Sequence, residues 1–494
     1  MLSRFSDSRP AVTVKNVALT YSGADKPALQ IEDLTIPEGQ CVVLCGQSGS
    51  GKSSFLKMLN GLTPEYYPAQ LSGQIFLGDL DLQKSSLEEI SRHIASVFQH
   101  PSTQFFHSQV LQELVFPCEN QGLSREEIEN RLAWVMELFG LASLSRRTIS
   151  SLSGGQQQRL ALAVTAMQGT DVLVLDEPTA NLDQEGIAIV EDILKTLKSQ
   201  GKTIIIAEHR LSYLSQLAEG KTIIIAEHRL SYLSQLADRY LYFQDGQVVT
   251  DYLADEFLSR TEECRQDMGL RCYDSEPYGR AIAELADQFV NDKEGLLVEN
   301  LSVSQKENTL YEIEKLCLAS GQVVGLVGAN GSGKTSLARY LVGLAEDKKS
   351  RISWQGQTLS SRQRLEKTAF VMQDVRLQLF AESVERELTL GRKNRAVDEH
   401  LVARFGLSDL LERHPVSLSG GEQQRVMIVA SLLADKEIFI FDEPTSGLDL
   451  RRMQQVASAL VDLKMKNKLV LLISHDEELL NLVCDKIVDI KQLK

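Results

Sequence analysis

The sequence GQSGSGKS at residues 46–53 fits the pattern G-x-x-x-x-G-K-[ST], and GANGSGKT at residues 328–335 fits it again. The glycines let the backbone curl so that its N–H groups point inward at phosphate oxygens. The lysine of each match reaches the outer phosphates, and the hydroxyl that follows ligates Mg²⁺. We therefore expect two nucleotide sites, with phosphate-binding residues Gly46, Gly49, Gly51, Lys52 and Ser53 in the first and Gly328, Gly331, Gly333, Lys334 and Thr335 in the second.

The residues around each match follow the order strand, glycine loop, helix. A β-rich start at residues 12–21 or 296–303 precedes an apolar run at residues 41–44 or 323–327. A helix is then predicted to open on Ser53 or on Thr335. This is the context in which the motif binds phosphate, because the loop leads into a helix N-terminus. The predicted fold class is α/β, with two tandem P-loop domains.

The two halves of the chain repeat the same motifs in the same order. Lys52 and Lys334 are 282 residues apart, whereas Asp176 and Asp442 are 266 apart, so the first half carries small insertions. We predict one domain at residues 11–250 and another at residues 294–494. Residues 251–293 are predicted to be an acidic, partly helical connector, because residues 251–292 hold four Arg against eleven Asp and Glu and one apolar-periodic stretch at 281–290.

A shorter repeat lies inside the first half. Residues 201–218 and 220–237 both read GKTIIIAEHRLSYLSQLA, a perfect tandem copy with a period of 19 residues. The first copy keeps the second half's spacing to the motifs before it, and the second copy keeps the spacing to those after it. Either His209 or His228 can therefore close this strand. His209 is favoured, because its strand follows the preceding helix at the spacing found before His475.

Two polar motifs follow each glycine loop. Gln99 and Gln373 each end a strand-like run, where a side-chain amide can touch Mg²⁺ and an attacking water. Further on, LSGGQ at residues 152–156 and LSGGE at residues 418–422 each run into a helix. A Ser-Gly-Gly segment that opens a helix presents N–H groups and a positive dipole end, which suits an anion.

Each half then has four apolar residues that run into two acids, Asp176-Glu177 and Asp442-Glu443. This pattern predicts a buried parallel strand with carboxylates at its C-terminal edge. The first acid can hold Mg²⁺ through water. The second can orient or deprotonate the attacking water, a role that contributes about 10²–10⁴-fold to a rate. The histidine that ends the next strand, His475 in the second half, is placed to sense the γ-phosphate.

Composition narrows the class of protein. A net charge of −15 argues against a nucleic-acid binder, which normally has a basic patch. The seven cysteines have no paired metal-ligand spacing, which fits a reduced compartment. The N-terminus lacks an apolar signal core, and no apolar run approaches the ~18 residues that span a bilayer. We therefore expect a cytosolic protein whose membrane role, if it has one, comes through partners.

Taken in order, these motifs resemble those of the ATP-binding cassette (ABC) ATPases over nearly the whole chain, twice. Residues 99–106 and 373–380 resemble the energy-coupling factor (ECF) and cobalt-import type, as do Glu113 and Glu387, each 14 residues past its glutamine. The resemblance implies that each domain has a mixed or parallel sheet core, an N-terminal antiparallel β subdomain and a helical subdomain.

The family pattern also implies that the two cassettes pack head to tail, with each ATP between the P-loop of one and the Ser-Gly-Gly of the other. Ser419 and Gly421 would then complete the first site, and Ser153 and Gly155 the second. The implied Mg²⁺ ligands are Ser53, Gln99, Asp176, Thr335, Gln373 and Asp442, and the implied catalytic residues are Glu177, Glu443, His209, His475, Gln99 and Gln373.

An aromatic residue near the start of each domain is implied to stack on adenine. Tyr21 fits this role in the first half. The equivalent position in the second half, near Gln305, is not aromatic, so adenine binding there is either looser or uses Tyr311.

The function implied is an ATP-hydrolysing energy-coupling subunit of a membrane importer for a vitamin or a metal ion. Its partners would be transmembrane subunits and a separate substrate-binding membrane component, with no nucleic acid. It would lie in the cytoplasm on the inner face of the membrane. Phe105, Phe106, Leu379 and Phe380 are candidate partner contacts, or else core residues. The alternatives are a soluble twin-cassette ATPase acting on ribosomes, which would need a basic connector, and a DNA-maintenance ATPase, which would need a coiled-coil insertion.

Overall fold

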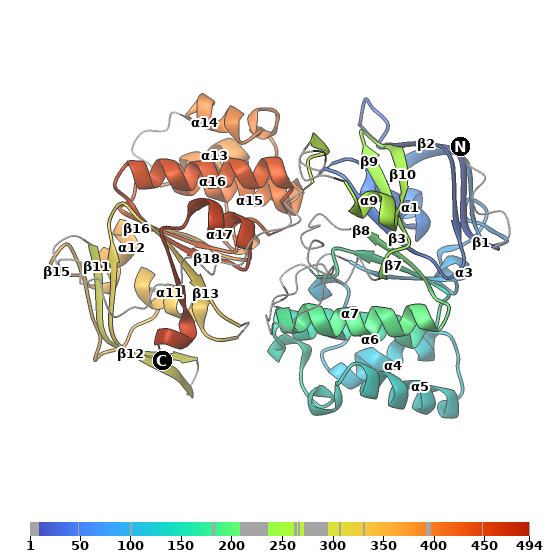
Figure 1. Cartoon of the computed structure of the whole chain (residues 1–494), viewed down its shortest axis with the longest axis horizontal. Coiled ribbons are helices and arrows are strands. Elements are labelled where there is room, and N and C mark those ends of the chain that lie inside the picture. Colours follow the sequence, from blue (N-terminus) through green and yellow to red (C-terminus); the bar gives the residue numbers. More distant parts are fainter. Residues whose placement is uncertain are drawn as a thin grey trace. The chain divides into compact units, whose positions relative to one another are not determined.

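The computed structural model describes residues 9–493, apart from 48, 99–100, 180–181, 183, 208–235, 261–263, 265–266, 271–294, 306–307, 330, 392–396 and 447. Residues 1–274 and 275–494 form two compact units (Figure 1), each described by itself below. The predicted helical stretch at residues 281–290 lies outside the described residues.

The first unit contains two sheets. One is antiparallel, with order β2-β1-β4-β5, and the other has order β10-β9-β3-β8-β7-β6. In the second sheet all neighbours are parallel except the β10–β9 pair. The strands are β1 (Pro10–Tyr21), β2 (Leu29–Pro37), β3 (Cys41–Cys45), β4 (Ala69–Leu77), β5 (Leu80–Asp81), β6 (Ile94–Val97), β7 (Val172–Asp176), β8 (Thr203–Ala207), β9 (Arg239–Gln244) and β10 (Gln247–Leu253).

The helices of the first unit cover both faces of the larger sheet. Figure 1 shows α6 and α7 along the sheet, and α4 and α5 pack against α6 to form the predicted helical subdomain. The helices are α1 (Lys52–Leu59), α2 (Leu62–Glu65), α3 (Leu87–Ser91), α4 (Val110–Asn120), α5 (Arg125–Leu138), α6 (Gly154–Gln168), α7 (Gln184–Ser199) and α9 (Ala254–Leu258).

The central strands are apolar throughout because both of their faces are buried. Cys41, Val43 and Cys45 of β3 belong to the cluster with α4 to α7, whereas Val42 and Leu44 belong to the cluster with α1 and the antiparallel sheet. All five residues of β3 are fully buried. A parallel strand covered on both faces therefore reads as an unbroken apolar run, as the sequence predicted.

The second unit repeats this arrangement. Its antiparallel sheet has order β12-β11-β14-β15, and its parallel sheet has order β16-β17-β18-β13-β19. The strands are β11 (Gly295–Gln305), β12 (Asn308–Ala319), β13 (Val323–Val327), β14 (Arg351–Trp354), β15 (Gln357–Thr358), β16 (Thr368–Val371), β17 (Ile438–Asp442), β18 (Leu469–Ile473) and β19 (Lys486–Asp489). The helices are α11 (Lys334–Val342), α12 (Ser361–Lys367), α13 (Val384–Thr389), α14 (Glu399–Arg404), α15 (Gly420–Leu433), α16 (Leu450–Met465) and α17 (Glu477–Val483).

The structure differs slightly from the sequence-based predictions in where helices begin and where the first unit ends. The helices after the two glycine loops begin at Lys52 and Lys334, one residue earlier than expected. Part of the predicted connector packs on the first unit, because Phe257 and Leu270 are both 1% exposed in its core. Among the described helices, none is long and apolar enough to cross a membrane.

Candidate functional site

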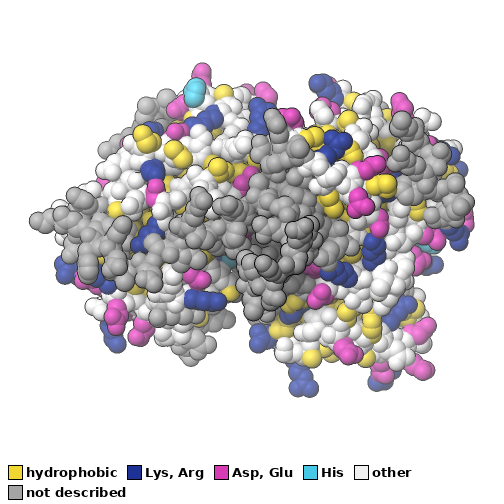
Figure 2. Space-filling model, in the orientation of Figure 1, with side chains coloured by type: hydrophobic (Ala, Val, Ile, Leu, Met, Phe, Trp, Pro, Cys, Tyr) yellow, Lys and Arg dark blue, Asp and Glu magenta, His cyan; other side chains and the backbone are white. Residues whose placement is uncertain are grey.

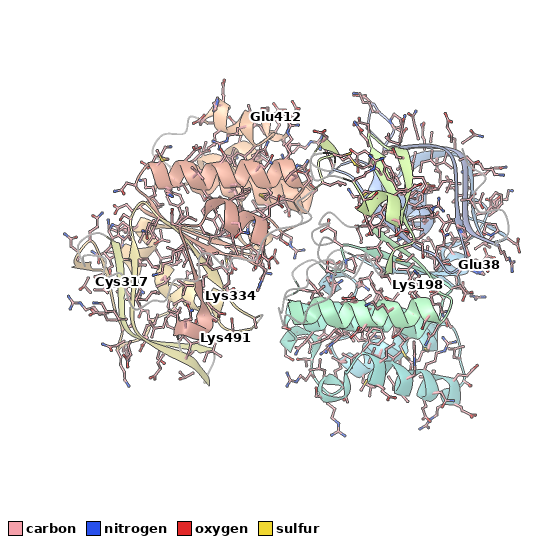
Figure 3. The ribbon with its side chains drawn as sticks, viewed as in Figure 1. Glu38, Lys198, Cys317, Lys334, Glu412 and Lys491 are labelled. Atoms are coloured by element: carbon pink, nitrogen blue, oxygen red, sulfur yellow. The ribbon has the colours of Figure 1, made fainter. Side chains whose placement is uncertain are left out.

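Both glycine loops wrap around their own lysine. The Lys52 ammonium donates to the carbonyl oxygens of Gly46 at 2.6 Å and Gln47 at 3.0 Å. The Lys334 ammonium donates to the Gly328 carbonyl at 2.6 Å and the Ala329 carbonyl at 3.1 Å (Figure 3 labels Lys334). Both lysines are buried. Each half therefore holds one cation inside a loop that opens a helix, which is a phosphate-binding geometry.

The backbone conformation requires glycine where each loop begins. Gly46 has φ +143° and Gly328 has φ +145°, a region that side chains disfavour. A β-carbon on Gly46 would also lie 2.2 Å from the Phe243 carbonyl oxygen. The remaining predicted glycines, all at positive φ, are Gly49, Gly51, Gly331 and Gly333.

The paired acids end the expected strands. Asp176 closes β7 and Asp442 closes β17, and the glutamate that follows each has a left-handed backbone, with φ +50° at Glu177 and +52° at Glu443. Each of these glutamates donates its N–H to the neighbouring strand, to Ala207 at 2.9 Å and to Ile473 at 2.8 Å. These bonds fix the backbone of both glutamates beside the ends of strands β8 and β18.

Two of the three predicted metal ligands come together in each half. Thr335 donates its hydroxyl to Asp442 at 2.6 Å, and the corresponding Ser53 and Asp176 oxygens are 3.5 Å apart. Burial raises the pKa of Asp442, and the Thr335 hydrogen bond and the Lys334 charge oppose that rise. A hydroxyl and a carboxylate fit Mg²⁺, which takes one or two protein oxygens plus phosphate oxygens and water.

His475 joins this cluster in the second half. Its Nε2 lies 3.1 Å from the Lys334 ammonium and 3.7 Å from Glu443 Oε1. Lysine can only donate, so Nε2 is the acceptor in this contact. The His475 N–H and the Ser474 hydroxyl both lie 3.3 Å from Glu443 Oε2, to which they donate. Lysine, histidine and glutamate therefore converge on one point.

In the first half, Gln99, His209 and His228 lie outside the described residues, as does most of the tandem repeat. The strand of the first copy is described. It forms β8, paired with both β3 and β7. In the second half, the predicted Gln373 is exposed just beyond β16.

The two Ser-Gly-Gly segments begin helices α6 and α15. Ser153 and Ser419 are exposed N-caps in capping boxes with the third residue of each helix, Gln156 or Glu422. The Ser419 N–H and hydroxyl both donate to Glu422 at 2.8 Å. Gly155 and Gly421, which follow, are half-buried. Each segment thus presents a helix N-terminus, but only the second adds a carboxylate to it.

The candidate adenine residues differ between the halves. Tyr21 is half-buried and donates its hydroxyl to Ser54 at 3.2 Å, next to the P-loop. Tyr311 is 5% exposed and donates its hydroxyl to the Gly333 carbonyl at 3.1 Å. Burial raises the pKa of Tyr311. Tyr311 therefore packs beneath its P-loop rather than presenting a ring face.

The structure also gives Glu113 and Glu387 a clear structural role. Glu113 is 1% exposed and accepts the N–H groups of Phe106 at 3.0 Å and His107 at 2.7 Å. Glu387 is 4% exposed and accepts those of Phe380 at 2.8 Å and Ala381 at 2.7 Å. Two hydrogen bonds to its glutamate therefore fix each loop. Phe106 and Phe380 on these loops are 79% and 78% exposed.

Sequence reasoning missed a second glutamine in each of these loops. Gln104 accepts the Phe98 N–H at 3.1 Å, and Gln378 accepts the Met372 N–H at 2.8 Å. Each glutamine lies five residues past the predicted one. The sequence could have revealed them, because these glutamines occupy matching positions in the two halves.

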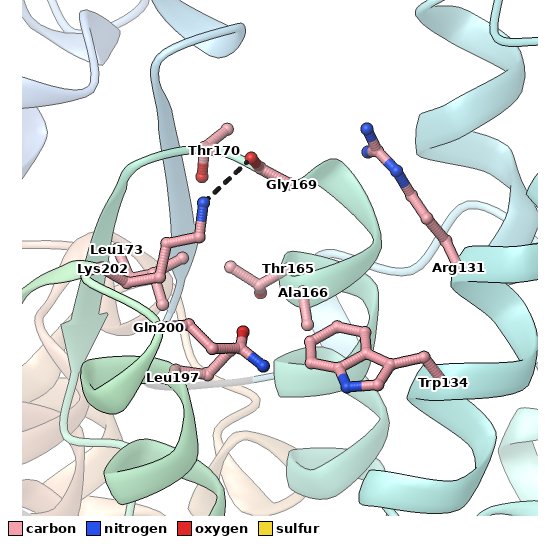
Figure 4. A pocket seen from close by; sticks show the side chains of 10 residues that line it. All are labelled: Arg131, Trp134, Thr165, Ala166, Gly169, Thr170, Leu173, Leu197, Gln200 and Lys202. Atoms are coloured by element: carbon pink, nitrogen blue, oxygen red, sulfur yellow. Dashed lines mark hydrogen bonds between the residues drawn. The ribbon is translucent and has the colours of Figure 1, made fainter. Parts of the chain in front are cut away.

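The first unit also holds a pocket away from the P-loop (Figure 4). Thr170 and Lys202 at its edge precede β7 and β8, so it lies at the amino ends of strands whose carboxyl ends face the P-loop. Lys202 donates to the Gly169 carbonyl at 3.3 Å and to Asp171 at 3.0 Å. None of the predicted site residues lines this pocket. Its lining residues are Arg131, Trp134, Thr165, Ala166, Gly169, Thr170, Leu173, Leu197, Gln200 and Lys202.

Comparison with known proteins agrees with this geometry. The family model described as ABC transporter matches residues 29–180 and 312–446. A Treponema denticola protein, provisionally named as an ABC transporter ATP-binding protein, is 35% identical over 489 residues, which cover 97% of this chain and 94% of that protein. A Bacillus subtilis protein, provisionally named as an HMP/thiamine import ATP-binding protein, is 29% identical over 505 residues, covering 97% and 89%.

A solved structure supports the fold over nearly the whole chain. The model of ribosome-bound archaeal Pelota and ABCE1 matches with a TM-score of 0.66 at 21% identity, covering 96% of this chain and 76% of that one. At this identity the likeness concerns the fold alone. The family match in both halves and the full-length relatives show that this chain is an ATPase of the ABC transporter family, with two fused cassettes.

Proposed function

We propose that each half of the chain binds one Mg·ATP and that the two halves close on both nucleotides together. In each site the P-loop lysine and N–H groups hold the phosphates, and the Ser-Gly-Gly helix of the other half covers them. Site one combines Gly46, Gly49, Gly51, Lys52, Ser53, Tyr21, Gln99, Asp176, Glu177 and His209 with Ser419 and Gly421. Site two combines Gly328, Gly331, Gly333, Lys334, Thr335, Gln373, Asp442, Glu443 and His475 with Ser153 and Gly155.

The chemistry follows from the cluster in the second half. Glu443 orients the attacking water and accepts its proton, and the His475 and Ser474 hydrogen bonds hold its carboxylate in place. Lys334 and the helix N-termini neutralise the charge that develops on the γ-phosphate. Mg²⁺ held by Thr335 and Asp442 would add positive charge there. Gln373 would contact the metal and the attacking water.

His209 serves the first site in this proposal, because the first repeat copy supplies β8. The Glu177 N–H bonds to Ala207 at the end of β8, just as the Glu443 N–H bonds to Ile473 at the end of β18. In the sequence, a histidine follows each of these strand ends by two residues.

We further propose that the chain is the energy-coupling ATPase of an importer of the ECF or cobalt type. The observation that carries this proposal is the pair of exposed phenylalanines, Phe106 and Phe380, each held on a loop by a buried glutamate. Placing a large apolar side chain in water is unfavourable, and the same arrangement occurs in both halves, so a partner surface is the expected reason. Both loops begin at the catalytic glutamines, which would link the partner to the nucleotide.

The partners would be transmembrane subunits and a separate membrane component that selects the substrate, and the chain would lie on the cytoplasmic face. The import name of the Bacillus subtilis relative supports a vitamin-type substrate. On the described surface in Figure 2, basic and acidic side chains are interspersed, which favours a membrane-protein partner over RNA.

Co-purification tests the importer role. The tagged chain is expressed in its own host, and the membrane and ribosome fractions are separated. We expect transmembrane proteins to co-purify with the chain, and a Phe106→Ser/Phe380→Ser variant to lose them. Met465→Ser is the matched control, because Met465 is also 79% exposed and lies on α16. Recovery of the chain with ribosomes, or equal membrane capture by both variants, would overturn the importer proposal.

A further inference from the structure

Residues 268–270, in the predicted connector, lie directly against the first P-loop. A β-carbon placed on Gly269 would lie 2.4 Å from Nε2, 2.6 Å from Cγ and 2.7 Å from Cδ of Gln47. Gln47 is the second residue of the first P-loop. Gly269 also has φ +70°, where a side chain is strained. The chain therefore passes over the exposed Gln47 side chain, which would have to shift to admit a β-carbon at position 269.

This contact is anchored on both sides. Tyr242 donates its hydroxyl to the Met268 carbonyl at 3.0 Å, and Leu270 is 1% exposed in the core cluster that contains Tyr242 and Cys45. Tyr242 pairs with Cys45, the last residue of β3 and the residue before the P-loop. The segment and the P-loop are therefore fixed to the same two strands, and Gln47 lies between them.

Gln47 connects this segment to the P-loop lysine. Its carbonyl accepts the Lys52 ammonium at 3.0 Å, while its side chain contacts Gly269. Ala329 occupies the equivalent place in the second half, and its carbonyl accepts Lys334 at 3.1 Å. Alanine keeps the backbone contact but has no side chain long enough to reach an overlying segment. The arrangement is thus a feature of the first half.

We propose that Gln47 and Gly269 are positioning residues for the first nucleotide site, through which the start of the connector holds the P-loop. The proposal rests on the function above, in which Lys52 binds ATP. In this arrangement a shift of the segment presses on the Gln47 side chain, and the backbone carbonyl of the same residue orients the lysine. The chain runs on from Leu270 through residues 271–294 into the second cassette, so the first site is tied to the segment that joins the two halves.

The test uses the full chain with Lys334→Ala, so that nucleotide binding reports the first site. Gly269→Ala places a methyl group against Gln47. Gly122→Ala is the matched control, because Gly122 has the same φ of +70° and nothing within 4 Å of an added β-carbon. Gln47→Ala/Gly269→Ala removes the clash and gives the first P-loop the second's alanine.

We expect Gly269→Ala to weaken binding of a fluorescent ATP analogue at least five-fold relative to Gly122→Ala. We expect the affinity of the double variant for the analogue to return to within two-fold of that of Gln47→Ala. A Gly269→Ala chain that had simply unfolded could not be rescued in this way. Equal affinities for Gly269→Ala and Gly122→Ala, or no rescue by Gln47→Ala, would overturn the proposal. Analogue binding that survives Lys52→Ala would instead refute the assignment of the site itself.

Hydrogen exchange on the chain with wild-type Gln47 and Gly269 gives a second measurement. We expect ATP to slow amide exchange at residues 268–270, and Lys52→Ala to abolish that slowing. Exchange at these amides that does not respond to ATP, in a chain that binds ATP, would contradict the coupling.

Discussion

At the scale of single residues, the second site is defined by a few short contacts. His475 Nε2 lies 3.1 Å from the Lys334 ammonium and 3.7 Å from Glu443 Oε1, and the Thr335 hydroxyl donates to Asp442. All five residues were predicted from the sequence, because each was expected to end a strand or open a helix. It could not show that the His475 ring accepts a hydrogen bond from lysine, since that depends on how two strand ends meet.

Glu443→Gln should remove the proton acceptor while keeping the side-chain shape. We expect turnover at the second site to fall about 10²-fold or more, and total ATPase to fall by at least half, while ATP still binds. Phosphate release measures this, and Glu412→Gln, an exposed change away from the site (Figure 3), is the control. Unchanged activity in Glu443→Gln would remove the glutamate from the mechanism.

Glu422→Gln should strengthen the first site. In our proposal the Ser419 segment covers the ATP of the first P-loop, and the Glu422 carboxylate places negative charge near the γ-phosphate. The first-half counterpart, Gln156, forms the same capping box without charge. We expect the KM for ATP to fall several-fold in Glu422→Gln. An increase in KM would show that the carboxylate has a positive role.

Asp442→Asn should stabilise the second cassette while preventing metal-dependent ATP binding. Burial raises the pKa of Asp442, so the unfolded chain loses this proton first as pH rises. Stability from this group is therefore present at low pH and is lost as pH rises from the unfolded pKa towards the folded one. At pH 7 the buried charge costs stability, and an amide avoids that cost. Calorimetry should show a higher Tm without nucleotide; a lower Tm would contradict this reasoning.

At the scale of elements, buried strands and their loops explain what the sequence did and did not reveal. Strands β3, β7 and β8 could be predicted from the sequence because both of their faces are apolar. The loops after Gln99 and Gln373 were recognised only by resemblance. Their shape depends on Glu113 and Glu387, which act from helices α4 and α13 several residues away, and single-sequence patterns do not encode such contacts.

Glu113→Ala should destabilise the first unit. It leaves the Phe106 and His107 N–H groups without their acceptor, which costs about 1–3 kcal/mol for a buried group. Glu113→Gln retains an acceptor oxygen and should cost less. Urea unfolding compares the two variants. Equal stabilities for Glu113→Ala and the unmodified chain would show that water replaces the carboxylate without cost.

Deleting residues 219–237 should leave a folded ATPase. The first copy supplies β8, and Asp238, which accepts from Lys198 and from the Cys41 N–H, is retained. A shorter closed loop should gain about 0.6 kcal/mol for each halving of its length. Thermal unfolding and ATPase assays measure both effects. Leu236 and Ala237 of the second copy are core residues, and the deletion leaves Leu217 and Ala218 of the first copy directly before Asp238 in their place. A large loss of stability would mean that Leu217 and Ala218 do not replace them.

At the scale of the whole molecule, the repeated order of motifs was enough to predict two α/β cassettes and their shared family. The domain limits were harder to predict. Phe257 and Leu270 pack in the core of the first unit, although the composition around them is typical of a connector. Composition records average polarity, whereas the packing depends on a few apolar side chains that fit one core. The pairing of the cassettes remains our proposal.

Vanadate-dependent photocleavage tests that pairing most directly. Vanadate trapped with Mg²⁺ and ADP takes the place of the γ-phosphate, and ultraviolet light then cuts the backbone that touches it. We predict cuts at both P-loops and also at Ser153 and Ser419, because each Ser-Gly-Gly segment would contact the nucleotide held by the other half. Cuts confined to the P-loops under trapping conditions would contradict the pairing of the two cassettes.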